Sequence, residues 1–239
     1  MKKILLFIAL VSVSFLKVQS QDVVYDENVE PRTVTEFSAI EVSGSISLYM
    51  SQSNDYAVAI SAGDQKNNSK IKTEVKNGVL KISVDGGLWN GMGWANRKLK
   101  AYVSFKSIRA LNISGASFVT SSGPITLDEL KIGVSGASEV KTEIHVKQLD
   151  LDISGASVAR LSGSADNASI DASGATKVSS YDLAINSCKA AASGASSIRI
   201  TANKELNASA SGGANIYYKG LASVVNINSS RGADIKKQD

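Results

Sequence analysis

The chain has 239 residues, a formal charge of +4, one cysteine, one histidine and two prolines. A single cysteine excludes an intramolecular disulfide, and the absence of a Lys/Arg cluster argues against nucleic acid as a partner, because that binding depends mainly on phosphate neutralisation. Abundant Gly, Ser and Ala favour a stacked β architecture over a helical bundle.

Residues 1–20 have the layout of a secretory signal peptide, with two lysines before an apolar run from Ile4 to Val13. Cleavage near Gln21 would leave residues 21–36 as an N-terminal extension and a mature chain with 23 basic and 22 acidic residues. The apolar run is too short to span a bilayer, so a transmembrane protein is not expected. We predict an exported protein that is periplasmic, outer-membrane-associated or extracellular.

Residues 37–108 are β-rich but irregular. Apolar and polar residues alternate from Phe37 to Met50, and residues 71–84 predict a hairpin that turns at Asn77-Gly78. This region is either a set of wider coils continuous with the repeats that follow or a small β cap on them.

The segment from Gly86 to Asn96 holds both tryptophans of the chain, Trp89 and Trp94, among glycines. Such rings could contact a ligand by stacking on sugars or docking a partner. They could equally fold back over an end or flank of the protein as a cap. The sequence leaves both readings open.

A tetrapeptide close to Ser-Gly-Ala-Ser recurs throughout residues 109–239. Its seven copies are separated by 21, 19, 19, 20, 19 and 19 residues, and the last two copies are degenerate. Glycine at a corner permits a positive φ or a close backbone approach, so we predict a structural turn at each copy. The predicted turn glycines are Gly115, Gly136, Gly155, Gly174, Gly194, Gly213 and Gly232.

Alternating residues precede each copy, as in Leu149 to Ile153, and another short β-prone piece follows it. Two or three short strands every 19–20 residues, without a helical stripe, predict an all-β fold that is a single-stranded parallel β-helix. Right-handed winding is expected because parallel crossovers are overwhelmingly right-handed.

Few residues suit catalysis. His145 is the only histidine and should lie on an outer strand face, whereas Cys188 should point into the core as an inert apolar residue. Without a second histidine or cysteine a zinc site is not expected. We therefore predict no catalytic, cofactor-binding or metal-binding residues, and no enzymatic activity.

Three aspartates form a candidate ligand-contact column. Asp150 and Asp152 share one strand face, and Asp171 takes the place of Asp152 one coil later. The column could bind a cation or a sugar, although solvated strand-face acids are the commoner case. No lysine or arginine is expected beside it.

Three segments give the chain a specific resemblance to a known family. The segments are Phe37–Ile46, Val75–Ile82 and Leu111–Ser117. From Thr35 to Asp239 the chain resembles the bacterial family described as "putative auto-transporter adhesin, head GIN domain". The resemblance implies an exported β-helical protein with a name that suggests adhesion, and it implies no catalytic residues.

The leading expectation is a non-enzymatic surface or periplasmic module, adhesin-like or structural, that binds a protein or glycan at the cell surface. The alternative is a carbohydrate-binding or polysaccharide-acting protein that uses Trp89, Trp94 and the aspartate column. A homo-oligomer is a third possibility, because an uncapped coil end exposes strand edges.

Overall fold

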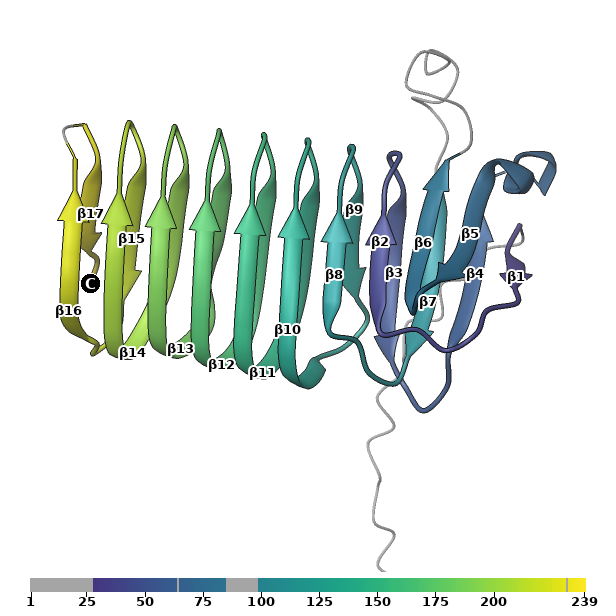
Figure 1. Cartoon of the computed structure of the whole chain (residues 1–239), viewed down its shortest axis with the longest axis horizontal. Coiled ribbons are helices and arrows are strands. Elements are labelled where there is room, and N and C mark those ends of the chain that lie inside the picture. The colour runs from purple at the N-terminus through teal and green to yellow at the C-terminus, as the bar shows by residue number, and fades with distance from the viewer. Residues whose placement is uncertain (1–27, 64, 85–98, 231) are drawn as a thin grey trace, which may run out of the picture.

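A computed structural model describes residues 28–63, 65–84, 99–230 and 232–239. Their strands form one 17-stranded sheet that winds into a solenoid of about seven turns (Figure 1). One short 3₁₀ helix, η1 (Gln65–Lys70), accompanies the strands. The predicted signal peptide, residues 1–20, lies outside the described residues, as do Trp89 and Trp94.

The repeats form the predicted parallel coils. Their strands are β8 (Ala110–Ile113), β9 (Phe118–Ser121), β10 (Ile125–Val134), β11 (Glu139–Ile153), β12 (Val158–Ala172), β13 (Lys177–Ala192), β14 (Ser197–Ala210), β15 (Asn215–Lys219), β16 (Ser223–Ser229) and β17 (Asp234–Lys237). Each strand pairs in parallel with its counterpart in the next coil. The interior is one continuous apolar cluster, because inward residues of successive coils stack in register.

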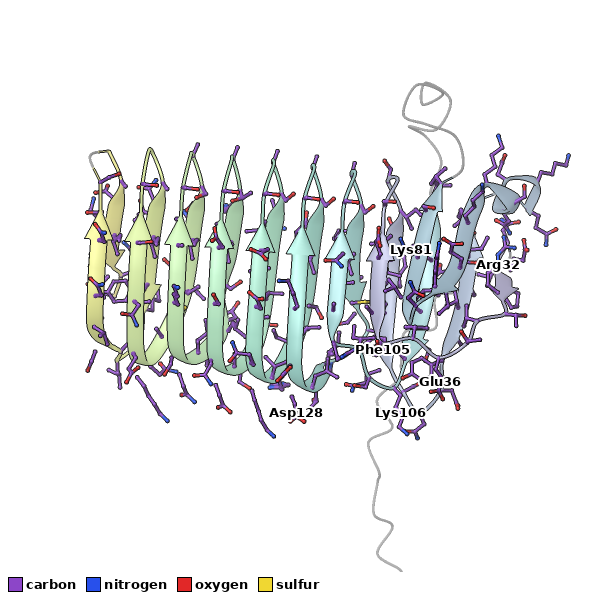
Figure 2. All side chains as sticks on the ribbon, in the orientation of Figure 1. Arg32, Glu36, Lys81, Phe105, Lys106 and Asp128 are labelled. Atoms are coloured by element: carbon purple, nitrogen blue, oxygen red, sulfur yellow. The ribbon has the colours of Figure 1, made fainter. Side chains whose placement is uncertain are left out.

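Each full coil has one tight turn and one gentle corner. β11 to β14 run for 14 to 16 residues, although the sequence predicts two or three short strands per coil. At the gentle corner the chain bends without a turn. Single residues there, such as Lys147, have no partner in the pairing between β11 and β12. Polar contacts between coils support this corner: Lys147 Nζ lies 2.7 Å from Asp128 Oδ1, and Asp128 is labelled in Figure 2.

The tight turns are joined by backbone hydrogen bonds that explain their glycines. Gly155 has a φ of 74°, and the N–H of Ala156 donates to the Gly136 carbonyl at 2.7 Å. A Cβ on Gly155 would lie 2.4 Å from that carbonyl oxygen. The repeated glycine is therefore required both by its positive φ and by the close approach of the coil before it.

The structure corrects one of the seven predicted turn glycines. The sixth turn uses Gly212, whose φ is 73°, and the prediction of Gly213 is wrong. The N–H of Gly213 donates instead to the Gly194 carbonyl, as alanine does in the copies before it. β14 has 14 residues whereas β13 has 16, so this copy reaches its turn early. Because Gly212 and Gly213 are adjacent, the sequence alone does not reveal that β14 is shorter.

The N-terminal region adds both coils and antiparallel strands. β2 (Ala39–Val42) pairs in parallel with β6 (Val79–Val84) and β8, and β3 (Ser47–Gln52) pairs in parallel with β7 (Lys100–Phe105) and β9. The β2–β3 coil therefore lies between the later β6–β7 coil and the repeats (Figure 1).

Antiparallel strands cover the outer end of this region. β4 (Ala57–Ser61) pairs with β7 and with β1 (Glu30–Arg32), and β5 (Ile71–Lys76) pairs with β6. The predicted hairpin turn at Asn77-Gly78 is confirmed, with positive φ values of 53° and 74°. Residues 37–108 thus supply stacked coils as well as an antiparallel cover, and their core is continuous with that of the repeats.

The last residue of each of the first five tetrapeptides points inward. These residues are Ser117, Ser138, Ser157, Thr176 and Ser196, and all are buried. Ser196 Oγ donates to the Ala172 carbonyl at 3.1 Å, whereas the described residues offer no partner to Thr176 Oγ1. The repeated hydroxyl is therefore a feature of the interior and not an exposed stripe.

We expect Gly155→Ala to lower the free energy of unfolding by about 3 kcal/mol, because it adds a strained backbone and an overlap with the Gly136 carbonyl. Denaturation by urea, followed by circular dichroism, measures the change. Gly123→Ala is the matched control, since its Cβ would meet no atom within 4 Å. Its effect should stay within about 0.5 kcal/mol. Equal losses in the two variants would contradict this account of the turn.

Thr176→Val should raise the free energy of unfolding by about 1 kcal/mol, because a methyl group of similar size replaces a buried hydroxyl without a partner. Ser196→Ala should lower it by about 1 kcal/mol, since a hydrogen bond is lost. Thermal and urea unfolding of both variants test the difference in sign. A destabilised Thr176→Val protein would show that the hydroxyl has a partner, such as a buried water.

Candidate functional site

The two strand segments of each coil give the repeat region two broad faces of outward side chains. We call the face formed by the strand segments before each tight turn the pre-turn face. Its segments are residues 110–113, 130–134, 149–153, 168–172, 188–192 and 206–210. The post-turn face is formed by the segments after each turn, which are residues 118–121, 139–143, 158–162, 177–181, 197–201 and 215–219.

The predicted aspartate column lies on the pre-turn face. Asp152 and Asp171 occupy paired positions on adjacent coils, as expected. Lys131 lies beside the column, with Nζ 3.2 Å from Asp150 Oδ2 and 3.5 Å from Asp152 Oδ2, so the expectation of no neighbouring lysine is wrong. The hydrogen bond and charge of Asp150, with the charge of Asp152, raise the pKa of the Lys131 ammonium.

This pairing changes what the column can do. A cation already neutralises part of its charge, so a metal ion would have to displace Lys131. Across the described ranges no three His, Cys, Asp or Glu side chains are grouped in a way that could hold a metal ion. The column is best described as a set of surface ion pairs.

His145 lies on the outer surface of β11, as the alternation predicts. Its Nδ1 is 2.9 Å from Ser164 Oγ and its Nε2 is 3.2 Å from Glu143 Oε1. The imidazole therefore links two neighbouring side chains on an open surface. His145 is not among the residues that line the polar hollow described below, although its partner Glu143 is.

Cys188 points into the core and is 3% exposed, which confirms its predicted position. Burial raises the pKa of its thiol to about 12, because the apolar surroundings disfavour the thiolate. The thiolate is the reactive form of cysteine, so this side chain is unsuited to nucleophilic chemistry in the folded protein.

The post-turn face contains a polar hollow of about 330 Å³. It lies where the ladder between β12 and β13 shifts register between Ala159 and Gly163, with one more residue on the β13 side. Such a bulge bends a strand locally and opens space beside it. The hollow is lined by Thr120, Ser121, Lys141, Thr142, Glu143, Arg160, Leu161, Ser162, Ser179 and Asp182.

The walls of the hollow are held by contacts between coils. Ser121 Oγ and Thr142 Oγ1 are 2.6 Å apart, and the Arg160 guanidinium forms an ion pair with Glu139. The sequence contains a signal for this site, because the interval from Gly174 to Gly194 is 20 residues, whereas the interval before it, from Gly155 to Gly174, is 19. The extra residue is the bulge.

A row of outward side chains crosses the post-turn face, one from each coil. In the repeats before the last, its members are the fifth residues after the turn glycines. We call it the post-turn row; it consists of Tyr102, Tyr49, Thr120, Lys141, Arg160, Ser179, Arg199, Tyr217 and Lys236. Tyrosines and cations dominate it, so the face can offer aromatic contacts and positive charge together. The sequence reading missed this row.

The aligned parallel coils define the class of the protein, which is a β-solenoid. The chain belongs to the family described as putative auto-transporter adhesin, head GIN domain, whose model matches residues 36–222. None of the curated proteins matches it.

Solved structures share the fold. An adhesin described as putative from Bacteroides fragilis superposes with a TM-score of 0.80 at 21% identity, covering 88% of this chain and 96% of its own. One from Parabacteroides merdae gives 0.67 at 19% identity, with 88% and 95% covered. A protein described as a putative lipid binding protein, from Parabacteroides distasonis, gives 0.62 at 20% identity, with 88% and 98% covered.

At these identities the likeness shows the fold alone, and the differing descriptions do not identify a common ligand. Across residues 28–63, 65–84, 99–230 and 232–239, no helix is both long and apolar enough to cross a membrane.

We expect Cys188 to resist a thiol reagent in the folded protein at pH 8, because the thiol is buried and its thiolate is suppressed. Unfolded in guanidinium, the same chain should react completely within minutes. Absorbance of the released chromophore measures both. Fast labelling of the folded protein would show that the core around β13 opens.

Proposed function

We propose that this protein is an exported, non-enzymatic, adhesin-like module that holds its partner on the post-turn face of the solenoid. The observation that carries the proposal is the post-turn row, with the polar hollow beside it. Strands hold these side chains in fixed register, so a partner meets a surface that is largely preorganised. The pre-turn face offers smaller groups, among them Gly133, Ser169, Ala191 and Ser209.

Two features support a binding role over a catalytic one. The imidazole of His145 is hydrogen-bonded to Ser164 and Glu143 on an open surface. The single thiol is buried with its pKa raised to about 12. For the imidazole and the thiol to act together in acid–base or nucleophilic chemistry, they would have to converge on a shared reacting position.

Export and a surface location are part of the proposal. The signal-like layout of residues 1–20 supports export, and membership in an adhesin-named family supports a role at the cell surface. A partner there would be a protein or a glycan.

A carbohydrate-binding role is the second candidate, and the hollow favours it. Its lining presents hydroxyl, carboxylate and cationic groups, which suit sugar hydroxyls. Asp150 and Asp152 support it less, because Lys131 is paired with both. Trp89 and Trp94 remain candidate contacts.

The proposal predicts that bacteria producing the full chain adhere to at least one surface in a panel coated with matrix proteins or glycans. Bacteria producing residues 21–239 without the leader should not adhere. Lys141→Glu with Arg160→Glu should reduce adhesion at least about tenfold, because both reverse the charge around the hollow. Lys131→Glu with Lys189→Glu makes the same charge change on the pre-turn face and should leave adhesion unchanged.

Surface proteolysis of intact cells and circular dichroism of the purified variants confirm display and folding. Loss of adhesion only in the pre-turn variant would move the site to the other face. If bacteria that carry the unmutated full chain on their surface do not adhere, that result would contradict the adhesin-like role.

A further inference from the structure

Two tyrosines and two cations lie close together on three consecutive coils of the post-turn face. They are Tyr181, Arg199, Tyr217 and Lys219. Arg199 Cζ lies 5.8 Å from the centre of the Tyr217 ring, and Lys219 Nζ lies 5.2 Å from the centre of the Tyr181 ring. Both distances are within the range of a cation–π interaction. The Tyr217 ring thus contacts a cation of the neighbouring coil, and the Tyr181 ring contacts a cation two coils away.

The two cations in this group lack the ion pairs that other cations of the solenoid make. Lys131, Lys147 and Arg160 are each paired with carboxylates. Within the part of the chain that the structure describes, Arg199 and Lys219 contact aromatic rings and no carboxylate. Their charge is therefore available to an incoming anion.

The group is partly buried and held by the backbone. The Thr201 hydroxyl donates to the Tyr181 carbonyl at 2.7 Å, and Arg199 pairs with Tyr217 in the β14–β15 ladder. Partial burial raises the pKa of Tyr181, the charge of Arg199 opposes that rise, and Tyr217 adds to it. The two tyrosines and Arg199 therefore interact electrostatically.

We propose that Tyr181, Arg199, Tyr217 and Lys219 form a binding site for an anionic polysaccharide, an inference that rests on the proposed binding function of the post-turn face. The cations pair with the carboxylate or sulfate groups of the glycan. The tyrosine rings contact the apolar faces of the sugars, and their hydroxyls bond to sugar hydroxyls.

The direction of the post-turn row favours a polymer over a compact ligand. Arg199 and Tyr217 belong to the row, which continues through Ser179 to Arg160 at the polar hollow. Because coils repeat about every 4.8 Å, an extended chain lying along the solenoid axis meets a new side chain at each step. A linear glycan with an anionic group on each sugar matches such a strip.

The test is isothermal titration of the mature chain, residues 21–239, with oligogalacturonate and with its methyl-esterified form. The charged form should bind, and the esterified form should bind at least about tenfold more weakly, because the anion is removed while the sugar ring stays. Raising NaCl from about 50 to about 200 mM should weaken binding of the charged form.

Variants locate the site. Arg199→Gln with Lys219→Gln should weaken binding at least about tenfold. Lys189→Gln with Lys204→Gln removes the same charge from exposed positions outside the group and should leave affinity within about twofold. Tyr181→Phe with Tyr217→Phe preserves the rings and should cost less than Tyr181→Ala with Tyr217→Ala.

The outcomes separate this inference from the proposed function. Three results would overturn the anionic-glycan site and leave the adhesin-like role standing. The two glycan forms could bind equally, the two charge variants could lose the same affinity, or polyglutamate could bind more tightly than oligogalacturonate. The same holds if no glycan binds while displaying cells still adhere. Charge-dependent binding that the Arg199→Gln, Lys219→Gln protein loses would support it.

Discussion

The stack of tight turns depends on one hydrogen bond repeated from coil to coil. At the five turns from Gly136 to Gly212 a backbone N–H donates to the carbonyl of the turn glycine in the coil before, at distances of 2.7 to 2.9 Å. The bond leaves no room for a Cβ on the glycine, as the 2.4 Å approach at Gly155 shows. It sets the position of every strand that leaves the turn. The inward ladders and outward rows follow from that register.

A fixed register separates the residues that make the fold from those that make the surface. Inward positions must remain apolar or small, whereas the fifth residue after each glycine can change freely because it faces solvent. This explains how structures only 19–21% identical to the chain keep its fold while their descriptions name different roles. The fold is a scaffold on which the outward rows are free to differ.

The sequence predicted the coil because its two main signals are local. A turn glycine and alternating strands can be read without knowing what lies beside them. The position of the β2–β3 coil between two later segments could not be read, since it depends on pairing between distant strands. Gly213 was mistaken for Gly212 because either glycine satisfies the motif, and only the pairing of β14 decides. The position of Lys131 beside Asp150 could have been predicted, because each residue precedes the turn glycine of its own coil by the same interval.

Pairing between coils also decides which charges can serve binding. On the pre-turn face, Lys131 lies one coil from Asp150, so register places opposite charges side by side and they largely satisfy each other. On the post-turn face, register places Arg199 beside Tyr217, and a ring orients the cation without neutralising it. A solenoid can thus hold some charges in ion pairs, as at Lys131 and Arg160, and keep others available where the neighbour is an aromatic ring, as at Arg199. Which residue stands one coil away determines whether a charged side chain stabilises the surface or can recruit a partner.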